Sequence, residues 1–126
     1  MKRKILSKLI EWKNKKNRKP LIVNGARQVG KTYILKEFGS HYYEKMAYVN
    51  CDKNKTLDKI FSQDYNISRI LLSLSAILHV NIEPENTLII FDEIQENPTV
   101  LNSLKYFCED ASQYHVAVAG SLLGIS

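Results

Sequence analysis

The segment with the clearest chemistry runs from Gly25 to Thr32. It fits the phosphate-binding pattern G-x-x-x-x-G-K-[ST] of the Walker A loop at every fixed position. Glycines allow the backbone to direct successive N–H groups at a polyphosphate, and the helix that follows offers the positive end of its dipole. Lys31 supplies a charge for the β- and γ-phosphate oxygens, and the Thr32 hydroxyl supplies a ligand for Mg²⁺. We therefore predict that ATP with Mg²⁺ binds at these residues: Gly25, Ala26, Arg27, Gln28, Val29, Gly30, Lys31, Thr32 and Tyr33.

A second chemical signal is the apolar run 88–91, which ends in Asp92 and Glu93. An unbroken apolar run is typical of a central parallel strand, whose carboxyl end would lie beside the phosphate loop. There Asp92 can hold Mg²⁺ directly or through water, and Glu93 can activate a water for attack on the γ-phosphate. This pattern is typical of a Walker B motif. Because many strands end in two acids, the assignment depends on the phosphate loop upstream. Gln95 either faces the same site or only belongs to the loop.

Four short apolar runs predict the strands that position these residues: Leu21–Asn24, Met46–Asn50, Leu88–Phe91 and His115–Ala119. Helical spacing lies between them, first over Tyr33–Phe38, so the first two strands form a βαβ unit with a right-handed crossover. The pattern thus predicts an α/β fold of three layers around a parallel sheet.

Helical spacing also covers residues 56–79, with Thr56 and Asn66 as candidate caps and a strand over Ile70–Leu74 as the alternative. Asn97 and Pro98 form a typical helix start. His41, Tyr42 and Tyr43 are expected in a connection, as surface aromatics rather than contacts to a nucleotide base.

The charge is concentrated at the N-terminus, where residues 1–20 hold nine Lys and Arg against Glu11 alone. Apolar residues at helical spacing predict an amphipathic helix over about Lys2–Lys15. With the linker that follows, this helix makes up residues 1–20, ahead of a single ATP-binding domain over 21–126 that is truncated at its C-terminus. The basic face is either a solvated surface, which we favour, or a patch for DNA or an anionic membrane.

We expect a cytoplasmic protein without a membrane span, since no stretch reaches the ~18 uninterrupted apolar residues of such a span and charges interrupt the start of the chain.

Cysteine spacing adds no metal site to this picture. Cys51 and Cys108 lack C-x-x-C spacing and a paired histidine, so we expect two reduced and mostly buried thiols.

These motifs together resemble the AAA-type ATP-binding domain of the archaeal-ATPase-like group of bacterial and archaeal ATPases. The resemblance is carried by three segments: Gly25–Thr32, Ile90–Gln95 and Ala119–Ser121. It implies a P-loop NTPase fold with ATP held by Lys31 and Thr32, Mg²⁺ held by Thr32 and Asp92, and water activated by Glu93. It also implies that Ser121, at the tip of its strand, senses the γ-phosphate; the alternative is a plain turn after Gly120.

The resemblance further implies parts that this sequence lacks. Such proteins continue with another strand, an arginine near the γ-phosphate and a nuclease-like or DNA-associated C-terminal domain, and nothing in its spacing makes Arg27 a substitute for that arginine. The expected strand order is 5-1-4-3-2 with the fifth strand missing, so the strand Leu21–Asn24 becomes an open edge suited to self-association.

Our functional expectation is an ATPase module that binds ATP or ADP with Mg²⁺ and hydrolyses ATP slowly, as the N-terminal part of a larger protein. Two alternatives remain open. One is a nucleotide-gated switch or scaffold with little turnover, and the other is a DNA-associated module that uses the basic helix.

Overall fold

The structure of the chain is a computed structural model, which describes residues 2–24 and 29–121. The elements within these ranges are α1 (Lys2–Lys13), β1 (Leu21–Asn24), α2 (Val29–Tyr42), β2 (Lys45–Asn50), α3 (Lys55–Gln63), α4 (Ile67–Leu78), β3 (Thr87–Asp92), the 3₁₀ helix η1 (Ile94–Glu96), α5 (Pro98–Asp110) and β4 (His115–Gly120).

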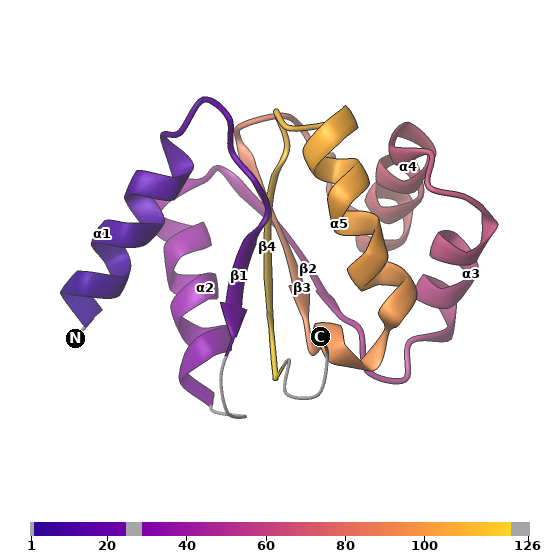
Figure 1. Cartoon of the computed structure of the whole chain (residues 1–126), viewed down its shortest axis with the longest axis horizontal. Helices are drawn as coiled ribbons and strands as arrows, with labels where there is room; N and C mark the ends of the chain where they lie inside the picture. The colour runs from indigo at the N-terminus through magenta and orange to yellow at the C-terminus, as the bar shows by residue number, and fades with distance from the viewer. Residues whose placement is uncertain (1, 25–28, 122–126) are drawn as a thin grey trace.

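The described strands form one all-parallel sheet in the order β1-β4-β3-β2. Figure 1 shows three layers, with α1 and α2 on one face of the sheet and α3, α4 and α5 on the other. Every residue of β3 and of β4 is buried, as expected for central strands covered on both faces. The predicted three-layer α/β fold is confirmed, and the four strands occur where the sequence places them, extended by no more than one residue at an end.

Two hydrophobic clusters hold the layers together. The cluster under α1 and α2 includes Leu9, Trp12, Leu35 and Phe38, and the cluster under α3–α5 is centred on the aromatic side chains of Phe61, Phe91 and Phe107. Full burial of one such side chain is worth roughly 1.5–3 kcal/mol. The sheet is therefore fixed from both faces, which keeps the ends of its strands in place.

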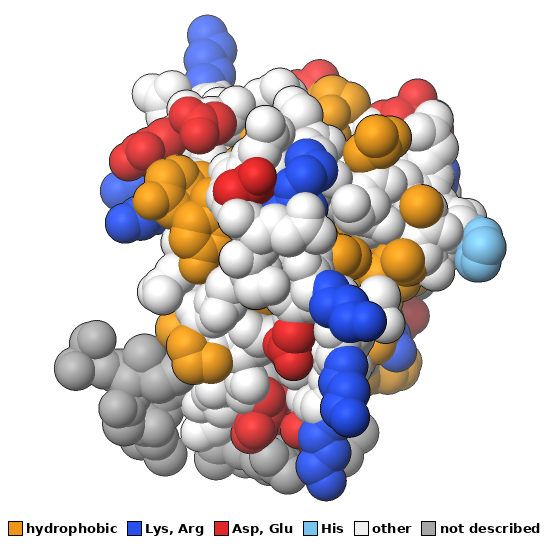
Figure 2. All heavy atoms as spheres, turned by 90° about the vertical axis from the view of Figure 1, so that its right-hand side faces the viewer, with side chains coloured by type: hydrophobic (Ala, Val, Ile, Leu, Met, Phe, Trp, Pro, Cys, Tyr) orange, Lys and Arg blue, Asp and Glu red, His pale blue; other side chains and the backbone are white. Residues whose placement is uncertain are grey.

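The outer surface of the α3–α5 layer is largely solvated. Figure 2 shows charged side chains of both signs there, with apolar side chains scattered between them. None of the helices in residues 2–24 and 29–121 has the length and apolar character needed to cross a membrane.

Helix α2 is longer than its sequence pattern predicts, and this corrects the expected position of three aromatic residues. His41 and Tyr42 belong to the last turn of α2 instead of a connection. Tyr43 is buried rather than a surface aromatic, and its hydroxyl lies 2.6 Å from Nδ1 of His115. Burial, followed by the charges of Arg18 and Lys13, lowers the pKa of His115 to about 4, so this histidine is neutral at pH 7.

The helices of the second layer start at asparagine residues. Asn66 and Asn97 cap α4 and α5 as predicted, and residues 70–74 belong to a helix rather than to a strand. The cap of α3 is Asn54 and not Thr56, because the Asn54 side chain accepts a hydrogen bond from the Leu57 N–H and leaves Thr56 inside the first turn.

Helix α1 is attached to the domain rather than extended into solvent. Leu9 and Trp12 are buried, while Ile5 and Leu6 of the predicted apolar stripe remain 40% and 37% exposed. The Arg18 guanidinium donates to the carbonyl of Lys13 at the end of α1 and, 3.0 Å away, to that of Ser112. These contacts tie the predicted linker to the segment that precedes β4, so α1 is held on the domain while the side chains of Lys4 and Lys8 are exposed.

Strand β1 pairs only with β4 within the described residues, and its Ile22 side chain is 51% exposed. We expect this edge to be covered by a second copy of the chain or by an adjoining segment, since an apolar edge strand with unpaired backbone groups favours pairing. Light scattering should then detect a species larger than a monomer. A monodisperse monomer whose amides at 21–23 are as protected from hydrogen exchange as those at 88–91 would contradict this expectation.

Candidate functional site

Five of the predicted site residues meet at the carboxyl edge of the sheet: Lys31, Thr32, Asp92, Glu93 and Ser121. Helix α2 brings Lys31 and Thr32 to the end of β3 and β4, where the Thr32 hydroxyl donates to Oδ2 of Asp92 over 2.8 Å. The Lys31 ammonium donates to the carbonyl oxygen of Gly120 over 3.0 Å. Residues far apart in the sequence are thus brought together as the parallel topology requires.

The first half of the predicted phosphate loop, Gly25, Ala26, Arg27 and Gln28, lies outside the described residues. Val29 and Gly30 form the start of α2, and a Cβ atom added at Gly30 would meet none of the described residues within 4 Å. Among the described residues, a side chain at Gly30 would therefore extend into open space.

The Asp92 side chain is buried and held by several hydrogen bonds. It is 6% exposed, and its Oδ2 accepts from both Thr32 and the Tyr48 hydroxyl, the latter over 2.5 Å. Its Oδ1 accepts from the backbone N–H of Glu93 over 2.9 Å. Three donors thus fix the carboxylate in one orientation.

Tyr48 is a site residue that the sequence pattern did not predict, and it contacts Asp92. Burial, followed by the hydrogen bond to Asp92, raises its pKa, so the phenol keeps its proton and acts as a donor. Lys36 of α2 lies 4.0 Å from the centre of the Tyr48 ring. The available signal was positional, because β2 and β3 pair in parallel and both end at this edge.

Glu93 has an uncommon backbone conformation, with φ 52° and ψ 47°, in the left-handed region. A non-glycine residue there costs of order 1–3 kcal/mol, and such conformations are concentrated at functional sites. Glu93 accepts a hydrogen bond from Nε2 of Gln95 over 2.6 Å, while Oε1 of Gln95 accepts the backbone N–H of Ser121 over 3.1 Å. Gln95 therefore faces the site and joins two of the predicted residues.

The oxygen donors of this site fit Mg²⁺. A Thr hydroxyl and one carboxylate, completed by phosphate and water oxygens, are a usual set for Mg²⁺ bound with a nucleotide. Thr32 and Asp92 are adjacent and present such oxygens. No group of three or more His, Cys, Asp or Glu suited to a metal occurs among residues 2–24 and 29–121, and Cys51 and Cys108 are free thiols, buried and partly buried respectively.

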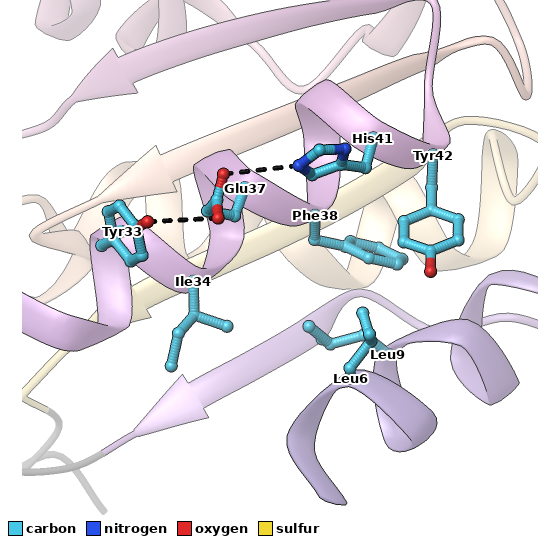
Figure 3. A pocket seen from close by; sticks show the side chains of 8 residues that line it. All are labelled: Leu6, Leu9, Tyr33, Ile34, Glu37, Phe38, His41 and Tyr42. Carbon is cyan, nitrogen blue, oxygen red and sulfur yellow. Dashed lines mark hydrogen bonds and ion pairs between the residues drawn. The ribbon is translucent and has the colours of Figure 1, made fainter. Parts of the chain in front are cut away.

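Tyr33, the last residue of the predicted nucleotide-binding set, has its side chain in a different place. It lines an open groove of about 280 Å³ between α1 and α2, which Figure 3 shows with Leu6 and Leu9 opposite α2. Its hydroxyl donates to Glu37 over 3.1 Å, and its side chain is half exposed. Lys31, Thr32 and Asp92 do not line this apolar groove, so we distinguish it from the candidate site.

The sheet order, the helix that follows β1 and the acidic end of β3 define a protein of the P-loop NTPase-like three-layer class. A family model described as an AAA domain matches residues 17–126, so the chain belongs to this AAA domain family. Comparisons with curated proteins and with solved structures gave no match. Membership of this family indicates a nucleotide-binding domain.

Proposed function

We propose that this domain binds ATP with Mg²⁺ and hydrolyses it slowly, as the N-terminal ATPase module of a larger protein. The observation that carries the proposal is the contact between Thr32 and Asp92, which joins the start of α2 to the end of β3 in an AAA domain. A hydroxyl and a carboxylate at this distance fit the metal side of a bound triphosphate.

Each residue of the site has a role in this proposal. The Lys31 ammonium leaves the Gly120 carbonyl to contact the β- and γ-phosphate oxygens. Thr32 and Asp92 would hold Mg²⁺, which when bound would neutralise negative charge on the triphosphate. Ser121, next to that carbonyl at the tip of β4, contacts the γ-phosphate.

Glu93 is the proposed general base. Its carboxylate takes a proton from a water that attacks the γ-phosphorus, the bond from that phosphorus to the bridging oxygen breaks, and ADP leaves with phosphate as the second product. In this proposal Asp92 would hold Mg²⁺, and Glu93, one residue later, orients the attacking water.

Calorimetry with ATP, ADP and GTP, each with and without Mg²⁺, tests the binding part of the proposal. We expect saturable ATP binding that Mg²⁺ strengthens, because Thr32 and Asp92 contact the phosphates mainly through the metal. A chain that is folded by circular dichroism but gives no heat with any of the three nucleotides would contradict the proposal.

Release of phosphate from ATP tests the hydrolysis part. Slow but measurable turnover by the parent chain supports an ATPase, while tight binding with no turnover above that of the Glu93→Gln variant would favour a nucleotide-gated switch. Heating curves with and without ATP provide the control, since a ligand of the native state raises the midpoint of unfolding.

A further inference from the structure

A continuous chain of hydrogen bonds links Lys31 to Glu93. The peptide group between Gly120 and Ser121 accepts from the Lys31 ammonium at its carbonyl oxygen, and its N–H donates to Oε1 of Gln95. The other end of the same amide donates to Glu93. One backbone peptide and one side chain therefore join the predicted phosphate lysine to the predicted base.

The fit of Gln95 depends on the absence of a side chain at Gly120. A Cβ atom at Gly120 would lie 2.2 Å from Oε1 of Gln95 and 3.0 Å from the backbone nitrogen of Ile94. Gly120 also has φ +157°, where L side chains are rare. The tip of β4 is thus shaped to admit the Gln95 carboxamide.

The 3₁₀ helix η1 fixes the other end of the link. Ile94 is fully buried, and the Glu96 N–H donates to the Glu93 carbonyl over 3.0 Å, so residues 93–96 form a tight turn. Gln95 is only partly exposed, and its carboxamide is bonded to Glu93 within this turn and to Ser121 directly after β4. The position of the Glu93 carboxylate is therefore coupled to the tip of β4.

We propose that Gln95 is a positioning residue that couples the Glu93 carboxylate to the Gly120–Ser121 peptide, so that phosphate binding at Lys31 and the orientation of the base are linked. The inference rests on the proposed function. When a phosphate draws Lys31 away, the Gly120 carbonyl loses its donor and the peptide can turn toward the phosphate. Gln95 then transmits this movement to Glu93.

Nε2 of Gln95 also donates to Glu96 over a long 3.5 Å. Two variants of Gln95 separate its shorter hydrogen bonds to Glu93 and to Ser121. Gln95→Ala removes both. Gln95→Glu keeps an acceptor for the Ser121 N–H but places a second carboxylate beside Glu93, where like charges repel. Gln113→Ala is the matched control, because Gln113 is an exposed glutamine outside the chain of hydrogen bonds.

We expect Gln95→Ala and Gln95→Glu to lower kcat at least tenfold and to change the Kd for ATP less than threefold, since a misplaced base affects the reaction more than binding. Gln113→Ala should match the parent in both. In a Glu93→Gln background, Gln95→Ala should cause less than a twofold further loss, because a residue that acts through Glu93 has nothing left to position. An additive further loss of tenfold would show a general structural role and overturn the inference.

Hydrogen exchange at the Ser121 amide tests the geometry independently of activity. We expect faster exchange in Gln95→Ala and parent-like exchange in Gln95→Glu, since only the former loses the acceptor. A parent that fails to bind or hydrolyse ATP would refute the proposed function itself. A parent that binds and hydrolyses ATP, with a Gln95→Ala variant of equal kcat, would refute only the coupling.

Discussion

Replacing Lys31 with alanine is expected to weaken ATP binding at least tenfold, or about 1.4 kcal/mol. The change removes a long cationic side chain of α2 that reaches the tip of β4, where the Lys31 ammonium donates to the Gly120 carbonyl. Phosphate oxygens are stronger acceptors for an ammonium than a peptide carbonyl, so Lys31 should transfer to a bound triphosphate. Calorimetry with ATP and Mg²⁺ measures the loss.

The affinity for ADP should fall less than the affinity for ATP, because the lysine is aimed at both the β- and the γ-phosphate and ADP offers only the first. Lys59→Ala is the control, since Lys59 is an exposed lysine on α3, in the opposite layer. If Lys31→Ala is folded and binds ATP as the parent does, the phosphate-loop assignment is wrong.

The sheet could be predicted because each strand is a short apolar run bounded by polar or turn-forming residues. Every residue of β3 and β4 is buried, and the apolar runs 88–91 and 116–119 within them indicate this burial. The caps at Asn66 and Asn97 could also be predicted, because a cap contacts only the helix that it begins.

The contacts that the sequence did not predict have one physical cause: they join residues that are distant in the chain. Tyr43 was expected on the surface because local sequence carries no sign of its partner His115, which is distant in the chain. The contacts of Tyr48 with Asp92 and of Gln95 with Ser121 were also not predicted. They form only when the strand register and the turn after β3 are in place. Side chains that join elements are determined by tertiary packing, which residue type and spacing do not encode locally.

The site residues differ in how firmly the sequence could place them. Thr32 and Asp92 follow from two motifs with fixed positions, and the structure brings them into contact. The contact of Lys31 with Gly120 could not be foreseen, because it depends on how far the tip of β4 extends past the end of β3. The roles of these residues in binding and hydrolysis stay predictions until they are measured.

Replacing Glu93 with glutamine should separate binding from hydrolysis. The substitution keeps the size of the side chain and an acceptor oxygen for Gln95, but an amide cannot take up the proton of the attacking water at neutral pH. We expect ATP and Mg²⁺ to bind within a factor of about three of the parent, and the rate of phosphate release to fall by ~10² or more.

Single-turnover measurements over long incubations suit this comparison, because an arginine supplied from elsewhere to the transferring phosphate is worth ~10³ to 10⁵ in rate and the parent rate without it is low. Glu109→Gln is the matched control, since Glu109 is an exposed acid of α5 and should not alter turnover. Turnover by Glu93→Gln equal to that of the parent would assign the base to another group. An amide cannot act as a general base, which excludes Gln95. The next candidate for the base would be the carboxylate of Asp92, which three hydrogen bonds hold in place.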